Sequence, residues 1–232
     1  MIIPNEIIFF LQIFCVALGN LVMLRLGCAA LTTYVGLLGI LSNLLVCKEV
    51  VLFGFTVTAS DSLAVGLILG LNLIQEWFGR RAVKIAIIAN FAMLISYLAL
   101  TQIHLWHIPA PNDVMHEHYH AIFTLMPRLA IASLTSYLIV QLVDSSLYRW
   151  LATLTSGRFF AWRNLASLCT SELLDTVLFS FLGLYGSVSS IGDIIIFSYF
   201  VKLISIVCFM PLIAFIKRLV PQQGEPYDPK NF

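Results

Sequence analysis

Three charged residues lie where an apolar sequence should exclude them. Glu172 and Asp175 fall within the apolar stretch 164–185, and Lys202 falls within the stretch 194–216. Glu172 precedes Asp175 by three residues, so both carboxylates face the same side of one helix. A charge near the centre of a bilayer costs about 2.5–3.5 kcal/mol even on a lenient insertion scale, and such residues usually mark function. The two carboxylates are therefore candidates for binding a solute and for carrying a proton.

The two stretches that hold these charges are joined by a short connection, residues 186–193. A short connection predicts antiparallel neighbouring helices, which would bring Asp175 and Lys202 together. We expect an ion pair, because each charge would offset the desolvation of the other. Opening this pair to a ligand would free two groups for charge-assisted hydrogen bonds.

Further polar side chains within the apolar stretches can be sorted by depth. Near the outer side we expect Asn43, Lys48, Asp61 and Arg128, and near the inner side Asn72, Glu76, Gln141 and Asp144. Polar groups at several depths suit a solute pathway, because each step must replace hydration that the solute has lost. The alternative is that these residues only hold helices together, since interhelical polar contacts add about 0.6–2 kcal/mol each.

Seven apolar stretches must position these residues: 5–24, 28–47, 57–77, 82–103, 123–147, 164–185 and 194–216. Each is long enough to cross ~30 Å of hydrocarbon as a helix. The 232 residues are 60% hydrophobic and 11% charged, less than half the charged share of a typical soluble domain. We expect an all-α integral membrane protein with about seven transmembrane helices. Residues 1–220 would form one transmembrane domain, and 221–232 a short disordered cytoplasmic tail.

The lysine and arginine residues indicate an orientation for these helices. Most fall on alternate connections, with Arg25 and the group Arg80, Arg81 and Lys84 on the same side. Cytoplasmic connections carry the excess of such residues, so the N-terminus is expected outside and the C-terminus inside. The chain would then be a multi-pass protein of the cell membrane.

Gly66 and Gly70 form a Gly-x-x-x-Gly pattern within the stretch 57–77. Small residues at this spacing lie on one face of a helix and let a neighbouring backbone approach closely. The pattern predicts close helix packing at this face.

Several function classes are excluded by what the sequence lacks. The net charge of +1 gives no basic surplus for a nucleic-acid partner. No His-Glu-x-x-His falls within a predicted helix and Gly-x-Ser-x-Gly does not occur, so we expect no enzyme activity and no cofactor. The Gly-x-x-x-x-Gly-Lys-Ser/Thr phosphate cradle is also missing, so ATP-driven transport would need a separate ATPase module.

All five histidines fall in one connection, three of them in the run His116-Glu117-His118-Tyr119-His120. Alternating His and Glu can chelate zinc or copper. The spacing matches no closed structural zinc site, and neutral imidazoles in a solvated loop cost little. We therefore predict no metal site, and a metal transporter using this outer cluster remains an alternative function.

As a set, the polar residues within the apolar stretches resemble those of the queuosine precursor transporter family, also described as putative vitamin uptake transporters. The likeness runs from about residue 41 to 212. It is carried by Ser42-Asn43-Leu44 leading to Lys48; Asn72-Leu73-Ile74-Gln75-Glu76-Trp77-Phe78-Gly79; Pro127-Arg128 through Ala132-Ser133 to Gln141 and Asp144; Arg163-Asn164 through Asp175-Thr176; and Tyr199-Phe200-Val201-Lys202. The chain departs at Asn72, where the family has Asp, and at Glu172, where it has Gln. Stretch 5–24 looks like an N-terminal addition to a six-helix core.

The resemblance implies uptake of queuine or a related 7-deazaguanine base through the bacterial inner membrane. A guanine-like edge presents an amide N–H beside an exocyclic amine, which a carboxylate such as Asp175 or Glu172 accepts together. Arg128, Gln141 or Asn43 would meet the carbonyl side of the base. The aromatic residues available to stack on the ring are Tyr137, Tyr199 and Phe200.

Two mechanisms stay open under this resemblance. The chain would work alone by proton-coupled or facilitated transport, or it would bind substrate beside a separate ATPase module. A homo-oligomer also remains open. The expected partners are thus the bilayer and a small deazapurine, with Asn43, Arg128, Gln141, Asp144, Glu172, Asp175, Lys202, Asn72, Glu76 and Tyr199 as candidate binding residues.

Overall fold

The computed structural model describes residues 4–154, 160–188 and 190–219, with side chains throughout except at 141, 144–154, 160–168 and 209–219. Helices make up most of it. They are α1 (Asn5–Leu26), α2 (Cys28–Leu45), α3 (Asp61–His104), α4 (His116–Leu154), α5 (Phe160–Phe179) and α6 (Ile191–Leu219), and a short π-helix, η1 (Ser180–Leu184), continues α5. A two-stranded hairpin, β1 (Glu49–Leu52) and β2 (Phe55–Thr58), connects α2 to α3.

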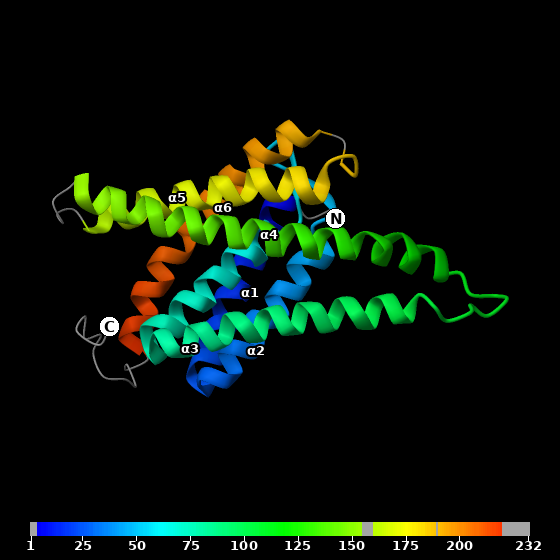
Figure 1. Cartoon of the computed structure of the whole chain (residues 1–232), viewed down its shortest axis with the longest axis horizontal. Helices are drawn as coiled ribbons and strands as arrows, with labels where there is room; N and C mark the ends of the chain where they lie inside the picture. Colours follow the sequence, from blue (N-terminus) through cyan, green and yellow to red (C-terminus); the bar gives the residue numbers. More distant parts are fainter. Residues whose placement is uncertain (1–3, 155–159, 189, 220–232) are drawn as a thin grey trace.

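Five helical segments in the described ranges are long and apolar enough to cross a membrane: Asn5–Leu26, Cys28–Leu45, Asp61–His104, His116–Val140 and Ile191–Cys208. The segment α3 is two helices joined at Gly79, whose φ of 83° is a backbone conformation that favours glycine. Figure 1 shows the chain turning back at this point. The predicted third and fourth spans are thus the two arms of α3, while the total of seven spans and their orientation remain predictions.

The hairpin between α2 and α3 was not predicted. The third span was expected to begin at residue 57, but Val57 lies in β2 and the helix begins at Asp61. The turn is formed by Phe53 and Gly54, with φ values of 53° and 84°, as in the turns that suit two-residue hairpins. Hydropathy alone did not separate these strands from α3, because the apolar residues of β2 are followed closely by those of the helix.

The hairpin is held from two sides. Glu6, in the first turn of α1, accepts a hydrogen bond of 2.9 Å from the backbone N–H of Phe53. On the other side, the ring of Phe55 stacks on that of Phe197 in α6, with 3.6 Å between the ring centroids. These contacts hold the turn of the hairpin and the first residue of β2 against α1 and α6.

The predicted packing at Gly66 and Gly70 is confirmed. A Cβ atom at Gly66 would clash with Val16 of α1, and one at Gly70 would lie 2.5 Å from Val35 Cγ2 of α2. The buried side chain of Asn20 also donates from Nδ2 to the carbonyl oxygen of Gly66 at 3.2 Å. Both N-terminal helices therefore pack closely against the first arm of α3.

The remaining helices build a second apolar cluster. It is formed by Val46, Met126, Leu129, Leu184 and Ile194, whereas the larger cluster lies among α1, α2 and α3 and includes Val201 of α6. In Figure 1, α4 and α5 run side by side, with α6 crossing toward α3.

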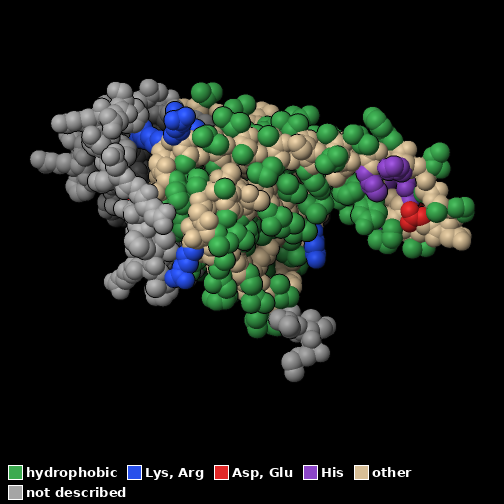
Figure 2. Space-filling view, turned by 90° about the horizontal axis from the view of Figure 1, so that it is seen from below, with side chains coloured by type: hydrophobic (Ala, Val, Ile, Leu, Met, Phe, Trp, Pro, Cys, Tyr) green, Lys and Arg blue, Asp and Glu red, His purple; other side chains and the backbone are tan. Residues whose placement is uncertain are grey.

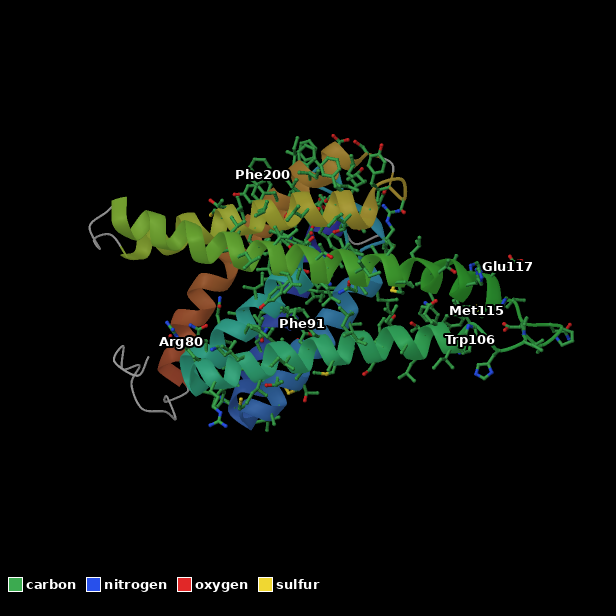
Figure 3. The ribbon with its side chains drawn as sticks, viewed as in Figure 1. Arg80, Phe91, Trp106, Met115, Glu117 and Phe200 are labelled. Carbon is green, nitrogen blue, oxygen red and sulfur yellow. The ribbon has the colours of Figure 1, made fainter. Side chains whose placement is uncertain are left out.

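The second arm of α3 and the start of α4 extend beyond the other helices (Figure 1). In Figure 3, Arg80 and Trp106 lie at opposite ends of this arm. Figure 2 shows the histidine side chains gathered at one tip beside acidic side chains, with lysine and arginine side chains toward the middle and the other end. The histidines of residues 104–120 thus lie at one end of the molecule.

Candidate functional site

A cavity of about 100 Å³ lies beside the second apolar cluster, whose members Val46, Leu184 and Ile194 form part of its wall. Most of the residues that line it are polar or charged, which is unusual among helices of this apolar composition. They are formed by Ser42, Asn43, Val46, Thr58, Ser60, Asp61, Ala64, Ser133, Asp175, Thr176, Phe179, Ser180, Leu184, Ile194, Ser198 and Lys202. Every helix except α1 contributes, as does the foot of the hairpin.

Lys202 is the centre of the polar network in this cavity. It lies about 16 Å along α6 from the first residue of that helix, and only 6% of the residue is exposed. Its ammonium donates to Asp175 Oδ2 and to Thr176 Oγ1, both at 3.1 Å. The ion pair predicted between Asp175 and Lys202 is therefore present.

Glu172 completes the surroundings of Lys202. Its Oε2 atom lies 3.5 Å from the ammonium, on the same side of α5 as Asp175. The Glu172 side chain is 5% exposed, whereas that of Asp175 is 38% exposed and lines the cavity. Asp175 is thus the carboxylate of the pair that a solute in the cavity could reach.

Asp61 is a cavity residue that the sequence analysis placed only in an outer layer. Its Oδ1 atom accepts a hydrogen bond of 3.2 Å from Thr58, the last residue of β2, and the residue is 5% exposed. Its Oδ2 atom makes no hydrogen bond among the described residues, while the hydroxyl of Ser198 in α6 lies close to the same carboxylate. The position of Asp61 within the apolar stretch 57–77 was a signal, but sorting by depth did not place it near Lys202.

Asn43 approaches the same cavity from α2, as predicted for a site residue. Its Nδ2 atom donates to the carbonyl oxygen of Gly39 at 2.9 Å. This bond fixes which end of the amide is the nitrogen, because only the nitrogen can donate. The Oδ1 atom is buried and, within the described part of the chain, has no partner.

The charges in this cluster do not balance. Asp61 lies within electrostatic range of both Lys202 and Glu172, and Asp175 contacts Lys202 directly. Two carboxylates thus contact one ammonium, and the buried carboxylate of Asp61 lies near enough to be influenced by its charge. Such a site is chemically suited to a proton, a cation or a ligand that presents N–H donors.

Arg128 does not line this cavity. Its guanidinium donates from Nε to the carbonyl oxygen of Leu182 at 3.0 Å and from Nη2 to that of Tyr185 at 2.6 Å. These carbonyls lie at the end of η1, where a helix leaves acceptors without internal partners. Arg128 therefore holds the end of η1, and the expectation that it meets the substrate carbonyl loses its geometric basis.

Four further candidates lie away from the cavity or cannot be placed. Asn72 and Glu76 are exposed on α3, about 16 and 22 Å along the helix from Asp61. The side chains of Gln141 and Asp144 lie outside the described residues. The predicted inner layer is therefore not brought to the cavity by any residue that the structure describes.

The aromatic candidates also take other positions. Tyr199 donates its hydroxyl to the carbonyl oxygen of Cys169 at 3.2 Å. Tyr137 makes an edge contact with Phe91 of α3, and Phe200 is 56% exposed on α6. The aromatic side chain in the cavity wall is that of Phe179, which the sequence analysis did not single out.

The connection predicted to hold all five histidines is shorter than expected, because α3 ends at His104 and α4 begins at His116. The run His116-Glu117-His118-Tyr119-His120, which has the His-Glu-x-x-His pattern, is therefore helical. The structure places several histidine rings in contact with one another and with nearby aromatic residues. The centroids of His104 and His107 lie 5.9 Å apart, and those of His116 and His120 lie 6.1 Å apart. Among the residues that the structure describes, no group of three His, Cys, Asp or Glu side chains is arranged to hold a metal ion.

Comparison with known proteins adds two findings. A family model described as putative vitamin uptake transporter matches residues 50–216, which include the cavity residues from the hairpin, α3, α4, α5 and α6. The probable queuosine precursor transporter of Bacillus subtilis (strain 168) is 27% identical over 199 residues, covering 84% of this chain and 86% of the relative. No solved structure matches the chain.

Proposed function

Because this chain belongs to the putative vitamin uptake transporter family, we propose that it imports queuosine precursors, as 7-deazaguanine bases, through the cavity around Lys202. The chain is a multi-pass cell-membrane protein of the transporter class. The observation that carries the proposal is the cavity whose wall contains Lys202, Asp61 and Asp175, with Glu172 buried beside Lys202. Intramembrane ionisable residues facing a cavity mark substrate and ion pathways.

The substrate class rests on the name of the Bacillus subtilis relative and on the chemistry of the cavity. A 7-deazaguanine base is small and planar, and one edge presents neighbouring N–H donors. The cavity offers carboxylate and amide oxygens that can accept from such donors. The side chain of Phe179 offers an apolar face to the ring.

Transport through this site requires the helices to move. At about 100 Å³ the cavity is smaller than the ~300–1,000 Å³ of typical ligand sites. The structure therefore corresponds to a closed state, and a base would enter as the walls separate. Asp175 is the more exposed partner of Lys202, so opening of this ion pair would release both groups toward the substrate.

A secondary or facilitated mechanism fits the unbalanced charges of the site. A proton entering the cluster would neutralise one of the three carboxylates around Lys202. Glu172 suits this role because it is buried beside Lys202 at 3.5 Å and is not part of the cavity wall. A proton moving inward with the base would then couple uptake to the proton gradient.

Uptake of radiolabelled queuine and of 7-deazaguanine precursors tests the proposal. The chain is expressed alone in cells that lack their own importer, and uptake is measured with and without a protonophore. We expect uptake that collapses when the gradient is removed. Uptake that survives points to facilitated diffusion or to an ATPase partner, and depletion of cellular ATP separates these two mechanisms.

The control is the Lys202→Met variant at matched membrane abundance. It removes the centre of the site, so uptake is expected to fall to the level of cells without the chain. The proposal is wrong if correctly inserted wild-type protein moves none of these bases.

A further inference from the structure

Three buried oxygen atoms of the cavity wall have no hydrogen-bond partner in the part of the chain that the structure describes. One is the Ser198 hydroxyl, which can donate as well as accept, and the other two can only accept. These two are Asp61 Oδ2, from a residue 5% exposed, and Asn43 Oδ1, from a residue 9% exposed. Both residues line the same cavity. A buried acceptor without a hydrogen bond costs about 1–3 kcal/mol, and more when it is charged. Acceptors left open in this way indicate a site that a ligand completes.

The protein fixes the direction in which both groups present their oxygen atoms. Thr58 Oγ1 donates a hydrogen bond of 3.2 Å to Asp61 Oδ1, so Oδ2 is the carboxylate oxygen that this bond leaves open. The bond from Asn43 Nδ2 to the carbonyl oxygen of Gly39 leaves Oδ1 as the free atom of the amide. The pair is therefore built to accept and not to donate.

The other carboxylates of the site are already engaged. Asp175 and Glu172 both lie against the Lys202 ammonium, at 3.1 and 3.5 Å. Asp175 also lines the cavity, but its Oδ2 atom is held by Lys202, whereas neither carboxylate oxygen of Asp61 lies within ion-pair distance of that ammonium. The resemblance implied that Asp175 or Glu172 reads the donor edge of the base, and the structure offers a different carboxylate for this task.

We infer that Asp61 and Asn43 read the 2-amino-4-oxopyrimidine edge of the substrate, accepting from its ring N–H and its exocyclic amine. The inference rests on the proposed function and names the residues that give it specificity. A base without the 2-amino group would leave one of the two buried acceptors unpaired. Sites built around such hydrogen bonds discriminate strongly against analogues that lack the donor.

Two bases that differ only in the 2-amino group test this inference. The full chain is purified in detergent, and thermal stabilisation is titrated with 7-deazaguanine and with 7-deazahypoxanthine. We expect the concentration that gives half-maximal thermal stabilisation to be at least tenfold higher for 7-deazahypoxanthine than for 7-deazaguanine. Equal stabilisation by both bases overturns the inference alone. Stabilisation by neither overturns the proposed function and the inference with it.

The Asp61→Asn variant gives a second readout. The new amide would accept from the ring N–H and donate to a 2-oxo group, so preference should shift from 7-deazaguanine toward 7-deazaxanthine by at least tenfold. The matched control is Asp193→Asn, which changes an exposed residue in the first turn of α6. An unchanged order of preference in Asp61→Asn overturns the inference.

Two further outcomes are decisive. If Asp61→Asn does not accumulate in the membrane, the test uses Asn43→Ser in its place. The inference then predicts that the concentrations of 7-deazaguanine and 7-deazahypoxanthine needed for the same stabilisation differ less than in the wild type. A cation held by the two oxygen atoms would instead make stabilisation depend on sodium and leave both bases equivalent. That result overturns the inference.

Discussion

Lys202 and Asp175 are 27 residues apart in the chain, yet Nζ and Oδ2 of these two residues lie 3.1 Å apart. The contact joins α6 to α5, and Thr176 and Glu172 extend it along the same helix. The positive charge of Lys202 is thus stabilised by several groups of α5 at once. Removing it would leave Glu172, which is buried, without its counter-charge.

The Lys202→Met variant should be strongly destabilised for this reason. Breaking a buried ion pair by removing one partner costs about 3–5 kcal/mol, because the other charge stays buried and unpaired. The melting temperature of the purified chain should fall well below that of Lys84→Met, which removes an ammonium from an exposed position on α3. Equal melting temperatures for the two variants would contradict the central place of Lys202.

Packing at Gly66 gives a prediction independent of the site. In Gly66→Ala the new methyl group would meet Val16 of α1, and overpacking of this kind costs about 1–3 kcal/mol. Gly192→Ala is the matched control, because a Cβ there meets nothing within 4 Å. Thermal unfolding should show a loss of stability at Gly66 alone. A neutral Gly66→Ala would show that α1 does not pack here in the membrane.

Arg128→Lys separates a structural role from a substrate-binding role. Lysine cannot reproduce the two hydrogen bonds to Leu182 and Tyr185, so the end of η1 should loosen. We expect a lower melting temperature and a lower maximal uptake rate, with KM unchanged, because Arg128 does not line the cavity. The exposed Arg81→Lys is the control. A large rise in KM with normal stability would instead place Arg128 in the substrate path.

The five histidines can be removed together. Replacing His104, His107, His116, His118 and His120 by Ala should leave uptake of the base within twofold of wild type, since none lines the cavity. Uptake kinetics at matched membrane abundance provide the measurement. Loss of base uptake, or restoration of uptake by added zinc, would favour the metal-dependent alternative.

Part of this account could be predicted from the sequence. Charges inside apolar stretches identified Asp175 and Lys202, and the short connection 186–193 was enough to pair them. Gly66 and Gly70 predicted close packing because spacing alone places both residues on one helix face. These are local or nearest-neighbour relationships, which sequence patterns describe well.

The rest depended on structure that hydropathy does not encode. The burial of Asp61 depends on the hairpin at 49–58, whose strands merge with the next apolar run. The position of Arg128 depends on where η1 ends, and the sequence carries no signal for a π-helix. Sorting by depth also separated Asn43 and Asp61 from Asp175 and Lys202, although all four line one cavity.

The measurement that tests the central claim most directly is base uptake by Ser133→Phe. Ser133 lines the cavity from α4, and a benzyl group there would occupy much of the space of about 100 Å³. Thr135→Phe is the matched control, because Thr135 lines a separate groove two residues further along the same helix. At matched membrane abundance, uptake of radiolabelled queuine precursors should be lost in Ser133→Phe and retained in Thr135→Phe. Retained uptake in Ser133→Phe would contradict transport through this cavity.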